Sequence, residues 1–520
     1  MDATRRARGL PAISLMPAPE SLSYIEDCRL ILVSNREPYE HARREHGIEV
    51  KKPAGGLVSA LDPTMRRTHG VWVAWGSGSA DRETADERGR VAVPPDNPSY
   101  LIHRVWLDDA DIDGYYHGFA NSALWPLCHM LIQHFQFRTD YWERYKAVNR
   151  RFAQAVAEEA LACGGARPMV WIQDYHLALV AEQVRALAPN AFTHQFWHIP
   201  FPPPDILHLL PMGTHEFVLR GLLGNDLVEF HTERYALNFL DCVDRFIPDA
   251  QVDPHRLTVT IGQRTVAVGA FPISIDVERF ERLARRPEAE ARAERLRRRY
   301  ARDGRQLGVC VDRIDYTKGI PERLRALDVL WSESPELRER VTFLFVATPS
   351  RTDLPVYRSL EEEVTATVLD INKRFARPGW TPIVLINENV DADLLASVYR
   401  AADLCLVSSL QDGMNLVAKE FIACQLEERG VLVLSRFTGA AEEIDGAVLI
   451  NPFNIDGFVN GIRSALHMSA EERAERMRLM REQLHKSTIF DWLDAVLSRA
   501  SAMLAQRAEV PAAPAVKTGA

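Results

Sequence analysis

Short runs of β-branched and aromatic residues alternate along the whole chain with longer segments whose apolar residues recur at helical spacing. This alternation is typical of parallel sheets covered by helices, because parallel strands are joined by helix-length crossovers. In the first half the predicted strands are residues 29–35, 71–75, 169–174, 191–198 and 226–232. In the second half they are residues 307–313, 341–349, 382–387, 404–408, 431–436 and 448–451. The sequence therefore predicts an α/β protein.

The chain has 520 residues, which is too long for one hydrophobic core, since cores stop growing at roughly 250–300 residues. We expect two Rossmann-like domains that face each other across a cleft, the place where open α/β sheets bind ligands. Residues 275–305, rich in Arg, Glu and Ala, are interpreted as an exposed helix with flanking connectors. The expected division is an N-terminal extension at 1–28, a first domain at 29–274, a second domain at 275–488, a C-terminal helix packing back on the first domain at 489–507, and a disordered tail at 508–520.

The balance of charge excludes several classes of partner. With 62 basic and 71 acidic side chains the net charge is −9, which disfavours nonspecific binding to nucleic acid or anionic membranes.

The N-terminal run 9–13 is interrupted by Pro11 and lacks the apolar core of an export signal, and no stretch approaches the ~18 apolar residues of a membrane span. The seven cysteines are scattered, as expected for reduced thiols. We expect a cytoplasmic protein.

Two cations follow the predicted strand at 307–313. Arg313 ends this strand, and Lys318 follows five residues later, directly before Gly319. Cations at the point where a strand gives way to a helix suit a diphosphate leaving group. The alternative interpretation is a solvated loop with a surface salt bridge.

A second polar loop follows the predicted strand at 404–408 and opens a helix. Its glycine allows close backbone approach, and the unpaired N–H groups of the first helical turn can hold phosphate oxygens. Asp412 can accept hydrogen bonds from sugar hydroxyls, and Glu420, about two turns into the helix, is placed to reach a ribose. The alternative is an N-terminal cap in front of a buried helix. The loop and first turn comprise Asp412, Gly413, Met414, Asn415, Leu416 and Val417.

Polar and aromatic groups also follow the predicted strands of the first half. Arg36 closes the first strand, and Gly55 and Gly56 precede a helix, which suggests anion binding; a turn and a helix C-cap are the alternative. Tyr116 and Trp125 lie nine residues apart, compatible with one helix face, where rings with polar tips suit a sugar. Core packing is the alternative for these rings.

Two strand ends in the first half carry groups suited to catalysis. Asp174 ends the strand at 169–174, with His176 two residues later, and His198 ends the strand at 191–198. Lone histidines after apolar strands are more often structural. Two such strand ends in one sheet, with an aspartate beside them, nevertheless predict catalytic residues at the base of the cleft.

Two further motifs are interpreted as structural. The run Gly76-Ser77-Gly78 resembles a dinucleotide-binding fingerprint, but Asp81 replaces the third glycine, which argues against a nicotinamide enzyme. The DxD-like residues 109–113 precede a helix, where acidic side chains favour the helix dipole. We therefore expect neither a cofactor nor a metal.

Together these motifs closely resemble the trehalose-6-phosphate synthase family, from about residue 30 to residue 504. The resemblance is carried by residues 34–36, 54–57, 116–125, 171–176, 198–202, 313–319 and 412–420, in the family's order. It implies a GT-B fold of two facing Rossmann-like domains. It also implies glucose transfer from UDP-glucose to glucose 6-phosphate, retaining the anomeric configuration, to give α,α-trehalose 6-phosphate.

The resemblance also implies roles for individual residues. The implied catalytic residues are Asp174, His198, Arg313, Lys318 and Asp412. The implied donor-binding residues are Gly56, Arg313, Lys318, Asp412, Gly413, Met414, Asn415, Leu416, Val417 and Glu420. The implied acceptor-binding residues are Arg36, Trp75, Tyr116, Trp125, Asp174, His231 and Arg351, with the arginines on the phosphate.

No carboxylate is obviously placed as a nucleophile, so retention is most simply explained by same-face attack through an oxocarbenium-like ion pair. In that scheme the departing diphosphate takes the acceptor's proton, and Arg313 and Lys318 stabilise the developing charge.

Two positions depart from the family pattern. His231 stands where trehalose-6-phosphate synthases commonly have glutamine, and Gln411 stands where they usually have arginine. The related glucosylglycerol-phosphate synthases resemble this chain at residues 36–39 and at His231, but are associated with loss of the glycine pair that this chain retains. The alternatives left open are thus glycerol 3-phosphate as the acceptor, or a catalytically silent sugar-phosphate sensor. No phosphatase domain follows Leu504, so a separate phosphatase is expected to act on the product, and a homo-oligomer remains open.

Overall fold

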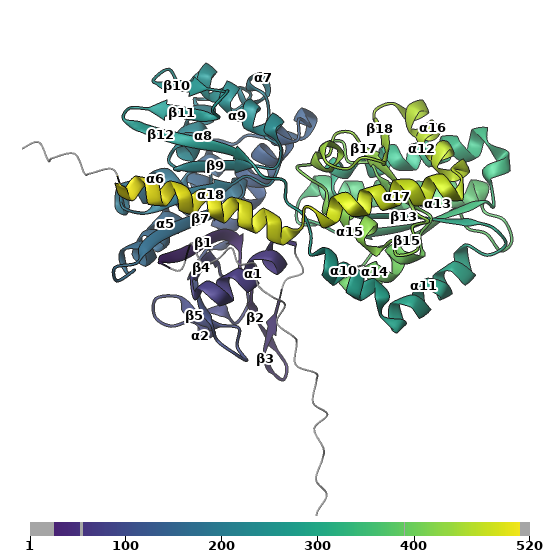
Figure 1. Ribbon diagram of the computed structural model, residues 1–520, viewed down its shortest axis with the longest axis horizontal. Coiled ribbons are helices and arrows are strands. Elements are labelled where there is room, and N and C mark those ends of the chain that lie inside the picture. The colour runs from purple at the N-terminus through teal and green to yellow at the C-terminus, as the bar shows by residue number, and fades with distance from the viewer. Residues whose placement is uncertain (1–24, 26, 53–55, 389, 510–520) are drawn as a thin grey trace, which may run out of the picture.

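The structure is a computed structural model that describes residues 25, 27–52, 56–388 and 390–509. Most of the predicted N-terminal extension, most of the predicted tail, and Gly55 lie outside these residues. Figure 1 shows two layered α/β units side by side. We call the part built on the ten-stranded sheet the N-terminal unit and the part built on the six-stranded sheet the C-terminal unit.

The ten-stranded sheet is parallel through its centre and antiparallel at both edges. Its central strands are nearly continuous apolar runs, as expected for strands buried on both faces; Ile31, Leu32 and Val33 have no exposed surface. In spatial order the strands are β10 (Ala250–Asp253), β11 (Thr258–Ile261), β12 (Arg264–Ala270), β9 (Leu227–Phe230), β8 (Phe192–Phe196), β7 (Arg167–Gln173), β1 (Cys28–Arg36), β4 (Val71–Trp75), β6 (Tyr100–Val105) and β5 (Arg90–Val93). A separate hairpin pairs β2 (Glu40–Arg44) with β3 (Gly47–Lys51).

The six-stranded sheet is parallel throughout. Its spatial order is β15 (Ile383–Ile386), β14 (Val341–Thr348), β13 (Gln306–Arg313), β16 (Leu404–Val407), β17 (Val431–Ser435) and β18 (Val448–Ile450). The order reverses direction between β13 and β16. Because ligands bind at the carboxyl ends of strands at such a switch point, this end of the sheet is the expected place for a site.

Helices cover both sheets. Those of the N-terminal unit are α1 (Gly56–Thr68), α2 (Asp81–Thr84), α3 (Asp109–Asp111), the π-helix η2 (Ile112–Leu124), α4 (Trp125–Cys128), η3 (Ile132–His134), α5 (Thr139–Leu161), η4 (Tyr175–Leu177), α6 (Val180–Leu187), α7 (Pro204–Leu207), α8 (Thr214–Leu223) and α9 (Glu233–Phe246). Those of the C-terminal unit are α10 (Val277–Arg285), α11 (Pro287–Tyr300), η5 (Tyr316–Lys318), α12 (Ile320–Glu333), η6 (Pro335–Leu337), α13 (Pro355–Phe375), α14 (Ala392–Ala401), α15 (Leu416–Cys424), η7 (Gly439–Glu442), α16 (Ile455–His467) and α17 (Ala470–His485). None of the described helices combines the length and apolarity needed to cross a membrane.

The last helix, α18 (Ile489–Glu509), returns from the C-terminal unit and lies along the N-terminal unit (Figure 1). Its Trp492 ring packs 5.6 Å from the Trp171 ring, and Arg507 forms an ion pair with Asp226. The chain thus passes between the units twice. The two passages touch, because the Ile489 N–H donates to the Ile275 carbonyl at 3.0 Å.

All the strands predicted above are present, although several lose a residue or more at their ends. The single exposed helix predicted at 275–305 is wrong: two helices occupy this range and break at Arg286, whose extended backbone precedes Pro287. Both helices also bury one face, including Phe280 and Ala293. Each of the two helices packs its apolar face against α14.

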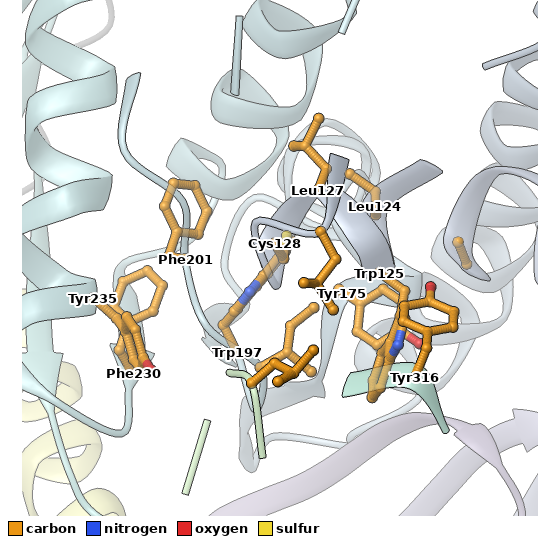
Figure 2. Packing of buried hydrophobic residues seen from close by; sticks show 14 of the residues in the cluster. Leu124, Trp125, Leu127, Cys128, Tyr175, Trp197, Phe201, Phe230, Tyr235 and Tyr316 are labelled. Atoms are coloured by element: carbon orange, nitrogen blue, oxygen red, sulfur yellow. The ribbon is translucent and has the colours of Figure 1, made fainter. Parts of the chain in front are cut away.

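Buried aromatic rings from both units share one hydrophobic cluster (Figure 2). Trp125 and Tyr175, whose ring centroids are 5.7 Å apart, belong to the N-terminal unit, and Tyr316 belongs to the C-terminal unit. Tyr235 on α9 belongs to the same cluster and lies beside Phe230 in Figure 2. The two units are therefore in apolar contact around the ends of their sheets.

Candidate active site

A cavity of about 370 Å³ lies between the two units at the carboxyl ends of their strands. The strand ends of both sheets converge there, which brings together residues more than 200 positions apart. The cavity is lined by Asp174, His198, His231 and Ile273 from the N-terminal side and by Asp312, Arg313, Lys318, Asp412, Met414, Asn415, Leu416, Val417 and Glu420 from the C-terminal unit.

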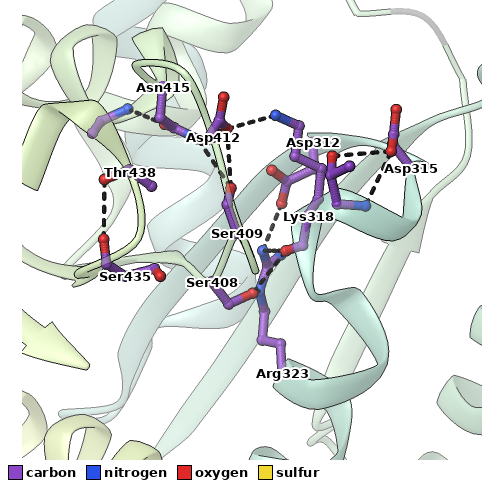
Figure 3. Close-up of polar contacts among 12 residues, drawn as sticks. Asp312, Asp315, Lys318, Arg323, Ser408, Ser409, Asp412, Asn415, Ser435 and Thr438 are labelled. Atoms are coloured by element: carbon purple, nitrogen blue, oxygen red, sulfur yellow. Dashed lines mark hydrogen bonds and ion pairs between the residues drawn. The ribbon is translucent and has the colours of Figure 1, made fainter. Parts of the chain in front are cut away.

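An ion pair between Lys318 and Asp412 lies at the wall of this cavity (Figure 3). Lys318 Nζ donates to Asp412 Oδ2 at 2.6 Å, and each side chain is only 14% exposed. Ser409 Oγ and Asn415 Nδ2 also donate to this oxygen, each at 3.1 Å. Burial raises the pKa of Asp412, but Lys318 outweighs it and holds that pKa at about 2. Asp412 is therefore a fixed carboxylate at neutral pH.

Glycine at position 413 is required by the close approach of the two units. A Cβ there would lie 2.3 Å from the His198 carbonyl oxygen, and a Cβ on Gly439 would lie 2.2 Å from the Gly413 oxygen. Asn415 then adopts φ of +88° and caps α15, accepting the Ala418 N–H at 3.1 Å. The loop thus reaches the N-terminal unit and starts a helix whose N-terminus faces the cavity.

A buried arginine holds the carboxyl end of β13. Arg323 donates to Asp312 at 2.6 Å and to Ser408 at 2.9 Å, and its side chain is 1% exposed. This arginine was missed from the sequence, where nothing separates it from other helical arginines. Arg313, by contrast, is exposed, lines the cavity and forms no hydrogen bond or ion pair with any described residue. Its charge is available to a ligand.

Asp174 and His198 lie together on the floor of the cavity. Asp174 has a left-handed φ of +70°, and its carboxylate accepts the His198 N–H at 3.3 Å. Burial raises the pKa of Asp174 to about 7, although N–H groups of Tyr175 and His198 oppose this. His198 Nε2 lies 2.9 Å from Gln173 Oε1, and burial lowers the pKa of His198 well below its ordinary value. His198 is therefore a neutral imidazole whose Nδ1 is free to accept.

His231 and Glu420 line the same cavity. The ring of His231 is 5.3 Å from that of His198, and burial lowers the pKa of His231 to about 3. His231, predicted to contact the acceptor, thus shares its cavity with the predicted donor residues. Burial raises the pKa of Glu420 to about 7, and Tyr399 OH donates to Glu420 Oε2 at 3.0 Å.

The other predicted acceptor residues gather around Tyr116. Arg36 Nη2 donates to Tyr116 OH at 3.0 Å, and the ring of Trp75 is 6.1 Å from that of Tyr116. Although burial raises the pKa of Tyr116, Arg351 and Arg36 hold it below its ordinary value. Arg351 approaches from the C-terminal unit and lies over the Trp125 ring. Two cations from different units therefore converge on one phenol.

Arg351 is fixed by residues that sequence reasoning did not assign. Its Nη1 donates to Asp315 at 2.9 Å and to Tyr357 OH at 2.6 Å. Its Nε is buried and has no hydrogen-bond partner among the described residues. Asp315 lies within the motif at 313–319, but Tyr357 lies inside α13 with no distinguishing pattern. A buried donor of this kind can be satisfied by a bound ligand.

Gly56 is the first residue of α1, and the rest of the glycine loop lies outside the described residues. The structure therefore gives the start of the helix but not the loop in front of it.

In the DxD-like segment at residues 109–113, Asp111 has partners within the protein that give it a structural role. Asp111 forms a capping box with Asp108, not with Asp109, and its buried carboxylate pairs with Arg151 and Arg144. Over the described ranges, no group of three or more His, Cys, Asp or Glu side chains is arranged to hold a metal ion. In the loop at 76–81, which resembles a dinucleotide-binding fingerprint, Asp81 accepts the Gly78 N–H at 2.6 Å. The loop is thus held by its own aspartate.

Comparison with known proteins identifies the family. Residues 28–502 match the model of glycosyltransferase family 20. The trehalose-6-phosphate synthase of Mycolicibacterium vanbaalenii is 39% identical over 480 residues, covering 90% of this chain and 96% of that protein. The structure of an α,α-trehalose-phosphate synthase from Burkholderia xenovorans in complex with glucose-6-phosphate has a TM-score of 0.80 at 32% identity, covering 91% of this chain and 99% of that one.

A trehalose-6-phosphate structure from E. coli, bound with UDP-2-fluoro glucose, has a TM-score of 0.79 at 31% identity, covering 91% of this chain and 99% of that one. The predicted GT-B arrangement of two Rossmann-like halves is thereby confirmed. The chain belongs to glycosyltransferase family 20.

Proposed function

We propose that this protein transfers glucose from UDP-glucose to glucose 6-phosphate, forming α,α-trehalose 6-phosphate with retention of the anomeric configuration. The observation that carries the proposal is the convergence of two cation sets on adjacent sites. Arg313 and Lys318 line the cavity in front of α15, and Arg36 and Arg351 meet at Tyr116. The first set suits a diphosphate and the second a sugar phosphate.

On the donor side, the C-terminal unit supplies nearly every group. Arg313 and Lys318 bind the diphosphate, backbone N–H groups at the start of α15 add to that site, and Glu420 binds the ribose. Asp412 accepts hydrogen bonds from the glucose. This assignment is supported by the cavity lining and by the UDP-2-fluoro glucose in the E. coli structure.

On the acceptor side, Arg36 and Arg351 bind the phosphate and the aromatic rings of Trp125 and Tyr116 face the sugar. The unpartnered Nε of Arg351 supports this assignment, as does the glucose-6-phosphate in the Burkholderia xenovorans structure. We further propose that residues 29–274 form the acceptor domain and residues 275–488 the donor domain.

The cavity's carboxylates are committed to other partners, which supports a retaining mechanism without a covalent intermediate. Asp312 is paired with Arg323, Asp412 with Lys318, and Glu420 accepts from Tyr399. Asp174 is held by the His198 N–H and is suited to binding a hydroxyl. We therefore assign no carboxylate as a nucleophile.

The C1–O bond to the β-phosphate breaks and the bond from C1 to the acceptor oxygen forms on the same face. The acceptor proton passes to the departing phosphate oxygen, whose charge Arg313 and Lys318 stabilise without a metal.

The test is a matrix of acceptors and donors on the purified protein. Glucose 6-phosphate, glycerol 3-phosphate and free glucose are compared at equal concentration with UDP-, GDP- and ADP-glucose, and the product's anomeric linkages are read by proton NMR. We expect the highest kcat/KM with UDP-glucose and glucose 6-phosphate. A larger kcat/KM for glycerol 3-phosphate would replace the proposed acceptor, and no turnover with any pair would favour a silent sensor.

A further inference from the structure

A chain of two hydrogen bonds crosses from the N-terminal unit to the loop that carries Asp412. Gln411 Nε2 donates to the hydroxyl of Tyr235 at 3.0 Å, and that hydroxyl donates to the main-chain carbonyl of Asp412 at 3.1 Å. Tyr235 comes from α9, whereas Gln411 and Asp412 follow β16. The side chains of Tyr235 and Gln411 are 1% and 5% exposed, so water does not compete for these bonds.

The hydroxyl of Tyr235 is suited to this double role. It donates its single proton to the Asp412 carbonyl and accepts from Gln411 Nε2 and, at 3.3 Å, from Arg234 Nη2. Burial raises the pKa of Tyr235, so the proton is retained at neutral pH. The ring belongs to the hydrophobic cluster that contains Phe230 and Phe239 and lies beside Phe230 in Figure 2, which leaves the hydroxyl little freedom to turn away.

The loop at 411–413 is held on several sides, so a shift of the Asp412 carbonyl also moves the Asp412 carboxylate. Gly413 is pressed against the His198 carbonyl, where no Cβ fits. The Asp412 carboxylate is held by Lys318 from within the C-terminal unit. The Asp412 carbonyl accepts from Tyr235 of the other unit and from the Gly439 N–H of its own unit, at 3.2 Å. Loss of the Tyr235 bond leaves this carbonyl held from one side, which allows the attached carboxylate to turn.

We propose that Tyr235 is a positioning residue that couples the meeting of the two units to the placement of the Asp412 carboxylate, with Gln411 orienting its hydroxyl. The inference rests on the proposed function in taking Asp412 to contact the donor glucose. The residues proposed to bind the diphosphate lie within the C-terminal unit. Binding of the donor nucleotide therefore precedes the contact between Tyr235 and Asp412 and does not depend on it. Glucose transfer requires both units and does depend on it.

The variants Tyr235→Phe, Gln411→Ala and their double mutant test the chain of bonds. Tyr235→Phe keeps the packed ring and removes only the hydroxyl. We expect kcat to fall about tenfold, the size of one buried hydrogen bond, with the dissociation constant of UDP within twofold of wild type by calorimetry. Gln411→Ala should lower kcat in the same direction. The double mutant should be no worse than Tyr235→Phe, because both changes break one chain.

Two control variants distinguish the loss of these hydrogen bonds from a general loss of structure. Tyr300→Phe makes the same chemical change on α11, far from the cavity. Arg298→Ala removes an exposed ion pair to Glu294, at 3.2 Å, on the surface of the C-terminal unit. Both should retain wild-type kcat, since exposed ion pairs contribute little.

Hydrogen–deuterium exchange gives a readout that does not use activity. In the unliganded protein, Tyr235→Phe should speed exchange in residues 409–416 and leave β13 unchanged. With an active wild type, a kcat for Tyr235→Phe within twofold of wild type overturns the inference, as does a loss of UDP affinity equal to the loss of kcat. If the wild type makes no trehalose 6-phosphate, the proposed function fails, and unchanged exchange in residues 409–416 then overturns the inference separately.

Discussion

The guanidinium of Arg351, in the C-terminal unit, stacks over the indole of Trp125, in the N-terminal unit, with its central carbon 4.1 Å from the ring centroid. Arg351 is 7% exposed and adopts a left-handed φ of +46°, and no other described arginine lies so close to a ring. The cation is thus fixed between an aromatic surface and the carboxylate of Asp315. The proposed acceptor site is therefore complete only where the units touch.

Replacing Arg351 by lysine keeps the charge but removes the planar fork that stacks and donates in several directions. We expect kcat/KM for glucose 6-phosphate to fall by at least ~100-fold, about 2.7 kcal/mol, while UDP binding stays within twofold. Initial rates at varied acceptor concentration, together with calorimetry for UDP, measure both quantities. A normal KM for glucose 6-phosphate in this variant would remove Arg351 from the acceptor site.

Replacing Arg313 or Lys318 by alanine should lower kcat/KM by at least ~100-fold, because in the proposed mechanism each stabilises the developing diphosphate charge. The two variants should differ in stability. Arg313 is exposed and its loss should leave the melting temperature unchanged, whereas loss of Lys318 leaves the buried Asp412 carboxylate without its cation. Steady-state kinetics and thermal unfolding on both proteins check this. Near-normal turnover in both would exclude the pair from the mechanism.

Chelation should leave most activity, because in the proposed mechanism Arg313, Lys318 and the N-terminus of α15 stabilise the diphosphate charge without a divalent ion. The measurement is turnover after exhaustive treatment with EDTA, compared with turnover after addition of Mg²⁺ or Mn²⁺. Activity lost to EDTA and restored by either ion would make Asp109 and Asp113 candidates for ligands again.

Asp174 should make stability depend on pH near neutrality. Burial raises its pKa from 3.8 to about 7, so between these values the folded protein binds a proton that the unfolded chain does not. Stability from this group is therefore full below pH 3.8 and is lost as pH rises towards 7. The variant Asp174→Asn cannot ionise, and it should melt at a higher temperature than wild type at pH 8 and lose that advantage at pH 4. A difference in melting temperature that is independent of pH would contradict the buried ionisation.

The central strands could be predicted because they are continuous apolar runs; β4 was predicted at 71–75, where the structure has it. The strands β2, β3, β6 and β12 were missed, and so were three short strands towards the ends of the sheet, β5, β10 and β11. These three are four residues long, mix polar with apolar residues and are partly exposed, so they lack the signal of a buried parallel strand. The break at Arg286 was missed because its neighbours all favour a helix, although Pro287 marked the start of the second one.

The candidate site could be predicted in part because parallel strands bring their carboxyl ends to one edge. This rule places Arg313, Lys318 and Asp412 together, and the structure gathers them in one cavity. The rule does not say which helical side chains reach the strand ends, either within a unit or across the two units. Tyr235 meets Asp412 across 177 residues, and Arg323 reaches Ser408 across 85. Both side chains lie on helices with no local pattern, so only the packed structure identifies them.

The two passages of the chain between the units lie side by side and are joined by the hydrogen bond from Ile489 to Ile275. A single connecting segment would let the units swivel about its axis, but two bonded segments resist torsion and bend most easily about the line across them. We therefore expect any relative motion of the units to be a hinge bend about that line. Such a bend would bring Arg351 back to Trp125 and Tyr235 back to Asp412 in one orientation.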